Sequence, residues 1–159
     1  MKISILAVGK IKEKFFTEAV KEYAKRLSRY CELTFIETED EPTPENASLR
    51  QEEQIREKEG ERLLARIPSG AYVIALAIQG KVWDSVSLSR HLSELTLAGK
   101  SHLIFVIGGS LGLSEAVLKR ADEQLSFSRL TFPHQLMRVI LLEQIYRSFR
   151  IARGEPYHK

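Results

Sequence analysis

The sequence predicts an α/β domain with a mostly parallel sheet flanked by helices. Strand-like and helix-like segments alternate along the 159 residues, as they do in successive βαβ units. Two runs, residues 72–78 (YVIALAI) and 102–107 (HLIFVI), are almost continuously apolar, which is typical of strands buried on both faces of a parallel sheet. No repeat or linker divides the chain, so we expect a single domain over residues 1–159.

The first half of the chain predicts two strands and two helices. Residues 2–8 form a short β-prone run that Gly9 ends. From about residue 13 to 30, apolar side chains recur at helical spacing and charged residues fill the other face. Residues 31–38 alternate as a strand does, and two prolines then mark a loop. Ser48 and Gln51 have the spacing of a capping box, so a highly charged helix is expected to run to about residue 67, although Gly60 lies inside it.

The second half repeats the alternation. We expect the strand at 72–78 to end at Gln79-Gly80, and a helix to follow over about residues 86–97. The strand at 102–107 leads into the glycine-rich stretch 108–112. Further elements are expected at the end of the chain: a short helix over 114–121, a short strand over 125–128 and a last helix over 134–152.

Composition excludes several classes of protein. Cys31 is the only cysteine and has no partner for an internal disulfide, which suits a reducing compartment. No apolar run reaches the roughly 20 residues of a membrane span, and no signal-peptide cleavage pattern follows the first strand. No pair of histidines has helical zinc-site spacing, and CxxC, HExxH, G-x-S-x-G and phosphate-loop motifs are absent. We therefore expect a cytoplasmic protein with no metal site.

Positive charge is concentrated at the C-terminal end. The chain has a net charge of +3, and residues 127–159 hold six basic and only two acidic side chains. Arg147, Arg150 and Arg153 recur every three residues, so they are expected to form one ridge that binds RNA phosphates. Two simpler interpretations stay open: a solvated helix face, and arginine stems that cover apolar neighbours.

The last helix carries apolar residues on more than one face. A helix packed only on its own sheet needs an apolar stripe of about 100°. The additional apolar surface of this helix indicates either a twofold partner or a central position within one subunit. The apolar side chains are Leu136, Met137, Val139, Ile140, Leu141, Leu142, Ile145, Tyr146, Phe149 and Ile151.

Three loops are expected at one rim of the sheet, where the carboxyl ends of parallel strands form ligand sites. They are Gln79-Gly80, the glycine stretch 108–112 and residues 126–134 (SFSRLTFPH). Glycine lets the backbone approach a ligand closely, although the glycine stretch alone also fits a tight turn. Together the three loops favour a site that holds a flat, uncharged aromatic group such as adenine through main-chain groups.

Four separated motifs then point to a known family. The opening KISILAVGKIKEK, the segment FVIGGSLGL, the segment LSFSRLTFPHQLMRVILLEQIYRSFRI and the ending RGEPYHK resemble the RlmH-type methyltransferases of the SPOUT superfamily. The resemblance runs from the first strand to the last residue.

This resemblance implies a fold and an activity that the residue patterns alone do not reach. It implies a C-terminal trefoil knot over about residues 72–159, a topology that general rules treat as near-absent. It further implies a homodimer that methylates N3 of a pseudouridine in 23S ribosomal RNA within the ribosome, with S-adenosyl-L-methionine as cofactor. The cofactor residues implied by the matching positions are Leu76, Gly108, Phe127, Ser128, Arg129, Leu130, Thr131 and Phe132.

The reaction requires the imide N3 to lose a proton, and a nearby cation would stabilise the charge that develops on the flanking oxygens. Our catalytic candidates are His134, Arg138, Tyr157 and His158. His158 is the candidate general base because the pKa of histidine lies nearest neutrality. Alternatively, Tyr157 and His158 only bind RNA. A non-catalytic ribosome-binding factor with this fold stays open, whereas the missing GxGxxG motif disfavours a nucleotide-dependent oxidoreductase.

Overall fold

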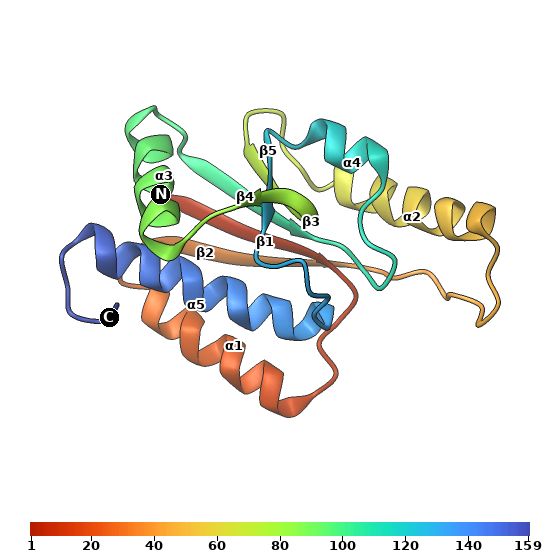
Figure 1. The fold of residues 1–159 in the computed structure, drawn as a ribbon, viewed down its shortest axis with the longest axis horizontal. Helices are drawn as coiled ribbons and strands as arrows, with labels where there is room; N and C mark the ends of the chain where they lie inside the picture. Colours follow the sequence, from red (N-terminus) through yellow and green to blue (C-terminus); the bar gives the residue numbers. More distant parts are fainter.

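The computed structural model describes residues 1–159 and contains one five-stranded sheet. The strands are β1 (Lys2–Val8), β2 (Glu32–Thr38), β3 (Tyr72–Val82), β4 (His102–Ile107) and β5 (Glu123–Ser126). The helices are α1 (Lys14–Leu27), α2 (Leu49–Leu64), α3 (Ser85–Leu97), α4 (Glu115–Arg120) and α5 (His134–Ala152). The sheet order is β2-β1-β4-β3-β5 and every pairing is parallel, which confirms the predicted fold class (Figure 1).

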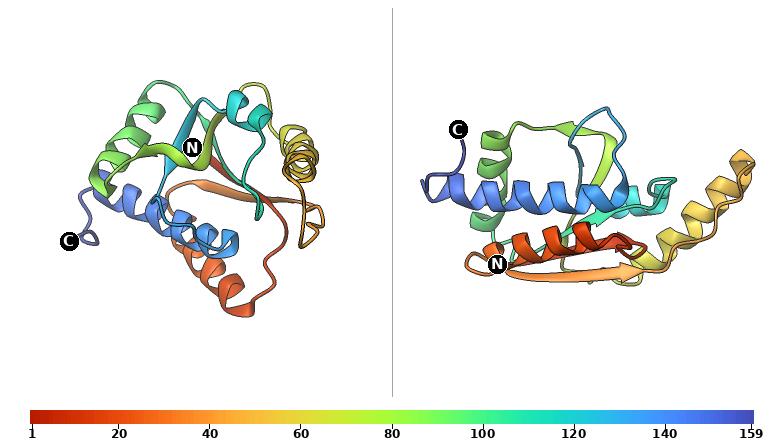
Figure 2. Two further views of the ribbon diagram at one scale, coloured as in Figure 1. Left: turned by 45° about the vertical axis from the view of Figure 1, so that its right-hand side comes forward. Right: turned by 90° about the horizontal axis from the view of Figure 1, so that it is seen from below.

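Helices cover both faces of the sheet. One apolar core lies between the sheet and α1, α3 and α5, and a second lies between the opposite face and α2 and α4 (Figure 2). Because β4 is buried along almost its whole length, the prediction of a doubly covered central strand is confirmed. No helix has the length and apolar character needed to cross a bilayer.

Helix α5 matches its predicted bounds and lies between α1 and α3. Leu141, Leu142 and Ile145 are fully buried in this position. The first turns also carry half-buried apolar side chains. The central position therefore accounts for part of the apolar surplus of this helix, and the twofold partner stays a prediction.

Strand β3 does not end at Gly80, so the predicted boundary was wrong. The strand continues to Val82, and its register against β5 shifts between Leu76 and Lys81. A Cβ on Gly80 would lie 2.7 Å from the carbonyl carbon of Gln124. The glycine therefore permits close approach of two strands rather than terminating one. Strand β5 accordingly begins and ends two residues before the predicted 125–128 segment.

Gly60 allows α2 to pack closely against the start of α4. A Cβ at this position would overlap the Ser114 hydroxyl oxygen and lie 3.0 Å from the Ser114 Cβ. That hydroxyl caps α4 by accepting a hydrogen bond from the Val117 amide at 3.3 Å. The packing explains why a residue with poor helix propensity stands in the middle of α2.

We predict that Gly60→Ala lowers the free energy of unfolding by about 1–2 kcal/mol, because the clash and the weakened cap outweigh the gain in helix propensity. Urea unfolding of the purified protein measures this difference. Gly70→Ala is the matched control, since nothing lies within 4 Å of its added Cβ. Equal stability of the two variants would contradict the packing role of Gly60.

Candidate functional site

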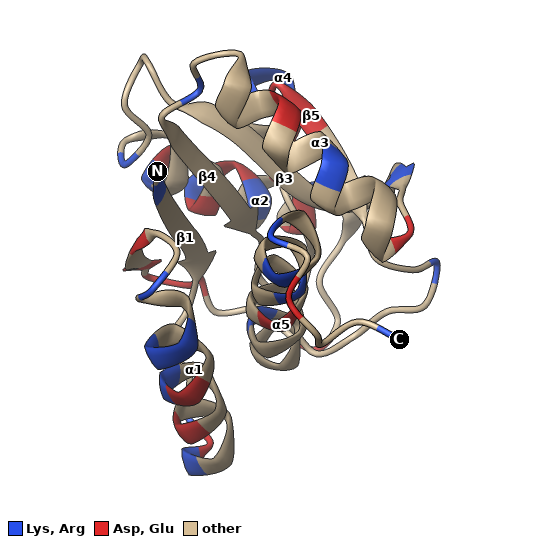
Figure 3. Cartoon of the chain, turned by 90° about the vertical axis from the view of Figure 1, so that its left-hand side faces the viewer, with Lys and Arg blue, Asp and Glu red and all other residues tan.

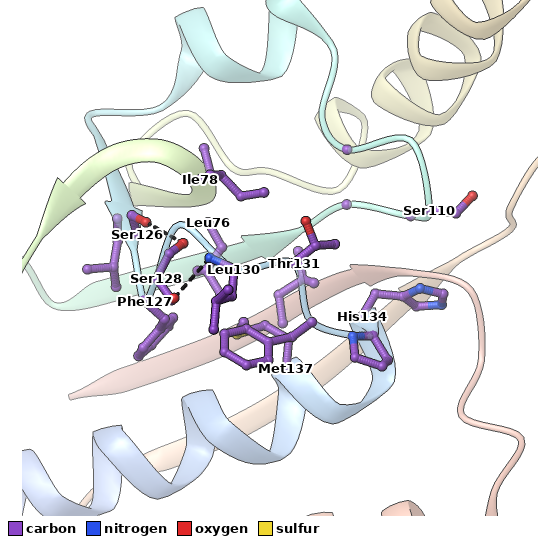
Figure 4. A pocket seen from close by; sticks show the side chains of 18 of the residues that line it. Leu76, Ile78, Ser110, Ser126, Phe127, Ser128, Leu130, Thr131, His134 and Met137 are labelled. Carbon is purple, nitrogen blue, oxygen red and sulfur yellow. Dashed lines mark hydrogen bonds between the residues drawn. The ribbon is translucent and has the colours of Figure 1, made fainter.

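A cavity of about 640 Å³ opens at the carboxyl ends of β4 and β5, beside the middle of β3 (Figure 4). Its wall comes from residues 76–78, 107–112 and 125–134, together with Met137 of α5, although Arg129 is not part of it. This volume lies within the usual range of small-molecule sites. The second and third predicted rim loops thus meet in one pocket. Gln79 and Gly80 continue β3 and do not line it.

The pocket wall contains no Asp, Glu, Lys or Arg side chain. Its polar side chains are hydroxyls and one imidazole, and some of the hydroxyls shape the loop itself. Ser126 Oγ donates to the Ser128 carbonyl at 3.1 Å, and the Leu130 amide donates to Ser128 Oγ at 3.0 Å (Figure 4). A pocket of this kind accommodates a neutral aromatic ring. Because its wall has no lysine or arginine, it does not repel a cationic ligand.

The glycine stretch makes a tight fold in this wall. Gly112 has a positive φ of 83°, and its amide donates to the Gly109 carbonyl at 3.1 Å. A Cβ on Gly108 would lie 2.8 Å from the Gly112 carbonyl carbon. The tight turn is therefore confirmed. The stretch also lines a cavity, and its part in ligand binding stays a prediction.

Glu59 of α2 supports this turn from behind, and sequence reasoning did not single it out. The side chain is buried, and Glu59 Oε2 accepts a hydrogen bond from the Glu41 amide at 3.0 Å. A Cβ on Gly109 would lie 3.2 Å from Glu59 Oε1. Burial raises the pKa of Glu59. In the sequence it is one of many acidic residues in a charged helix, so only the packing distinguishes it.

Seven of the eight predicted cofactor residues lie in the pocket wall. They are Leu76, Gly108, Phe127, Ser128, Leu130, Thr131 and Phe132. Arg129 belongs to the same loop but does not line the cavity. Their roles stay predictions, because position in a cavity does not identify a ligand.

His134 begins α5 and lines the pocket. Burial lowers the pKa of its imidazole, and the positive charges of Arg138 and Lys12 lower it further. The lowered pKa favours the neutral form of the imidazole, so little positive charge from it is expected in the cavity.

Arg138, another catalytic candidate, is 2% exposed and does not line the pocket. It donates to Glu37 at 2.6 Å and to the carbonyls of Gly9 and Val8 at 2.7 and 3.1 Å. The guanidinium thus joins α5 to the carboxyl ends of β1 and β2.

Tyr157 and His158 lie outside this pocket. The Tyr157 hydroxyl donates to Glu143 at 3.0 Å, and burial together with this bond raises the tyrosine pKa to about 12. His158 Nδ1 lies 3.0 Å from Arg147 Nη1. Because a guanidinium only donates, Nδ1 is the acceptor in this pair. His158 also lines a second cavity of about 540 Å³, which shares Phe127 with the first.

The predicted arginine ridge takes part in internal contacts. Arg147 pairs with Glu143, and Arg150 pairs with Glu155. Arg153 lies over the Tyr30 ring at 4.7 Å from its centroid. Acidic and basic residues accordingly stand beside each other on α5 (Figure 3). Their binding to RNA stays a prediction.

Comparison with known proteins gives consistent matches over the whole chain. A family model described as "Predicted SPOUT methyltransferase" matches residues 1–158. The chain is 56% identical to the ribosomal RNA large subunit methyltransferase H of Clostridium acetobutylicum and 58% identical to that of Bifidobacterium adolescentis. Each alignment covers 100% of both chains. The corresponding protein of Listeria monocytogenes is 57% identical over the same length.

Among solved structures, a probable methylase family protein from Haemophilus influenzae Rd KW20 has a similar fold. The TM-score is 0.54 at 11% sequence identity, and the match covers 99% of this chain and 70% of the other. At this identity the likeness concerns the fold alone.

Proposed function

Because the chain belongs to the SPOUT methyltransferase family, we propose that it methylates N3 of a pseudouridine in 23S ribosomal RNA within the ribosome. Full-length identity of 56–58% to proteins named ribosomal RNA large subunit methyltransferase H supports the RNA substrate. The structural observation that carries the proposal is the pocket at the carboxyl ends of β4 and β5, beside the middle of β3. Its wall includes three glycines and no Lys, Arg, Asp or Glu side chain.

S-adenosyl-L-methionine fits the character of this pocket and supplies a methyl group activated on a positively charged sulfur. Leu76, Phe127 and Phe132 offer apolar contacts for an adenine ring. Gly108, Ser128, Leu130 and Thr131 lie in the same wall, where their main-chain groups can bind the cofactor. Neutral His134 is compatible with a cationic ligand, whereas a protonated histidine would repel it.

The four catalytic candidates have different roles according to where they lie relative to the pocket. His134 faces the pocket, so we assign it a direct contact with cofactor or substrate. Arg138 positions the start of α5 through its bonds to Gly9 and Glu37. His158 accepts the N3 proton only after its Nδ1 leaves Arg147, and Tyr157 leaves Glu143 in the same rearrangement of the tail.

We further propose that the protein acts as a homodimer in the cytoplasm, where ribosomes are found. Exposed apolar side chains near the pocket support a second copy as partner: Ile78 and Leu130 on its wall, and Val82 and Val86 next to it. We place the knot of the family within residues 72–159.

The deciding experiment is transfer of labelled methyl groups to ribosomes that lack the mark. We expect stoichiometric labelling of large-subunit RNA at N3 of one pseudouridine, dependent on S-adenosyl-L-methionine. Calorimetry should show binding of this cofactor and none of NAD. Ribosome binding without transfer would instead favour a non-catalytic factor, and labelling at another atom would overturn the N3 assignment.

A further inference from the structure

The connection between β1 and α1, together with the first two residues of α1, presents an exposed basic and aromatic surface. Lys10, Lys12 and Lys14 are all exposed, and the Phe15 side chain is 62% exposed. The Phe15 ring packs on the half-buried Phe16 ring, with 4.4 Å between centroids. We call residues 10–15 the basic rim segment.

This segment is joined to the start of α5, beside a residue of the pocket wall. The Lys12 amide donates to Gln135 Oε1 at 3.0 Å, and the preceding residue of α5, His134, lines the cavity. The positive charge of Lys12 also contributes to the lowered pKa of His134. A substrate bound over the pocket therefore comes within reach of the segment.

The charges of the segment are available, unlike those of the arginine ridge. Lys10 and Lys12 form no ion pair within the chain, and Lys14 has only a solvent-exposed pair with Glu18 at 3.8 Å. Exposed ion pairs of this type contribute little to the free energy of folding, so the pair does not hold Lys14 away from a ligand. Two carboxylates of the adjoining β2 region, Glu37 and Glu41, are paired with Arg138 and Arg62. Glu13, inside the segment, is unpaired, so the three lysines leave the segment with a net charge of +2.

We propose that the basic rim segment binds the RNA substrate beside the target base, with its lysines on phosphates and Phe15 stacked on an unpaired base. The proposal rests on the function proposed above and places an RNA contact at a surface separate from the arginine ridge. Lysine supplies sequence-independent phosphate contacts. An exposed aromatic ring is the usual platform for a base that is splayed out of a loop.

The lysines are tested by salt dependence. In the variant Lys10→Gln/Lys12→Gln/Lys14→Gln, we expect the slope of log KM for ribosomes against log salt concentration to fall by about 2–3, one unit or slightly less per phosphate contact. The matched control replaces Lys58, Lys100 and Lys119 by glutamine, which removes the same charge from exposed positions on other parts of the surface.

Phe15 is tested by a graded series. We expect Phe15→Ala to raise KM for ribosomes by about 5- to 100-fold, with kcat at saturating ribosome and affinity for S-adenosyl-L-methionine unchanged. Phe15→Trp should keep the wild-type KM, whereas Phe15→Leu, which is apolar but cannot stack, should behave like alanine. If Phe15 had only a structural role, Phe15→Leu would behave like the wild-type protein. Phe15→Ala would then lower the thermal stability and leave KM for ribosomes unchanged.

The outcomes separate this inference from the proposed function. If the wild-type protein methylates ribosomes and the lysine and Phe15 variants keep its KM and salt slope, the basic rim segment does not contact RNA. If a membrane or protein ligand used the segment, the same variants would likewise leave ribosome KM unchanged, which counts against the proposal. Failure of the wild-type protein to methylate ribosomes would overturn the proposed function itself.

Discussion

Replacing Arg138 by methionine is expected to lower the free energy of unfolding by about 2–6 kcal/mol, because two buried main-chain carbonyls each lose a charged donor and an unsatisfied buried acceptor costs about 1–3 kcal/mol. Methionine fills much of the same space but leaves the Val8 and Gly9 carbonyls and the Glu37 carboxylate without their donor. Urea unfolding followed by the fluorescence of Trp83, the only tryptophan, measures the loss.

Glu37→Gln is the matched change on the other side of the pair. The Glu37 side chain is 38% exposed, and glutamine still offers an oxygen that can accept from the guanidinium. Because the buried Arg138 loses this counter-charge, we expect a cost of about 1–3 kcal/mol. An Arg138→Met protein with wild-type stability and no methyl transfer would contradict the positioning role and restore Arg138 as a catalytic candidate. Nearly equal costs for the two variants would show that the main-chain carbonyls contribute little.

The sheet and the pocket were predictable because they follow from local patterns. The apolar runs at 72–78 and 102–107 correspond to the first part of β3 and to β4, and the carboxyl ends of both runs line the pocket. Carboxyl ends of parallel strands share one edge of a sheet. The loops that follow β4 and β5 therefore met as expected, although neither loop has a specific motif on its own.

The arginines show what local patterns leave out. Arg138 pairs with Glu37, which lies 101 positions away in the sequence. Arg150 reaches Tyr30 across 120 positions. An arginine in a helix is normally exposed, so its spacing predicts a surface ridge. Burial and internal pairing depend on which distant chain segment the sheet order brings beside the helix, and no sequence pattern of α5 encodes that partner.

The roles of two glycines could not be predicted from the sequence for a related reason. Gly60 and Gly80 stand where helix and strand rules place a weak point or an end. In the structure both permit close contact with a segment more than 40 residues away, at Ser114 and Gln124 respectively. The absence of a side chain is visible in the sequence, whereas the neighbour that requires its absence is not.

Gly108→Ala is expected to weaken binding of S-adenosyl-L-methionine by about 10- to 100-fold. An extra methyl group in a packed site costs about 1–3 kcal/mol, and we expect this cost to appear in binding because the wall must deform. Each 1.4 kcal/mol is a tenfold change in affinity. The added Cβ would lie 2.8 Å from the Gly112 carbonyl carbon and 3.1 Å from a Leu113 methyl group. The turn must open to admit it, and the turn is part of the pocket wall. Calorimetric titration with the cofactor measures the change.

Gly112→Ala separates steric overlap from backbone strain. Its added Cβ meets nothing within 4 Å, but its φ of 83° is unfavourable for alanine. We expect a loss of about 1 kcal/mol in stability and a smaller loss of cofactor affinity than for Gly108→Ala. If Gly108→Ala binds the cofactor as tightly as the wild-type protein, the cofactor does not use this wall, and the site must be sought in the neighbouring cavity that contains His158. Suppose that the two variants have the same unfolding midpoint and only Gly108→Ala binds the cofactor more weakly. The shape of this turn would then be directly responsible for cofactor binding.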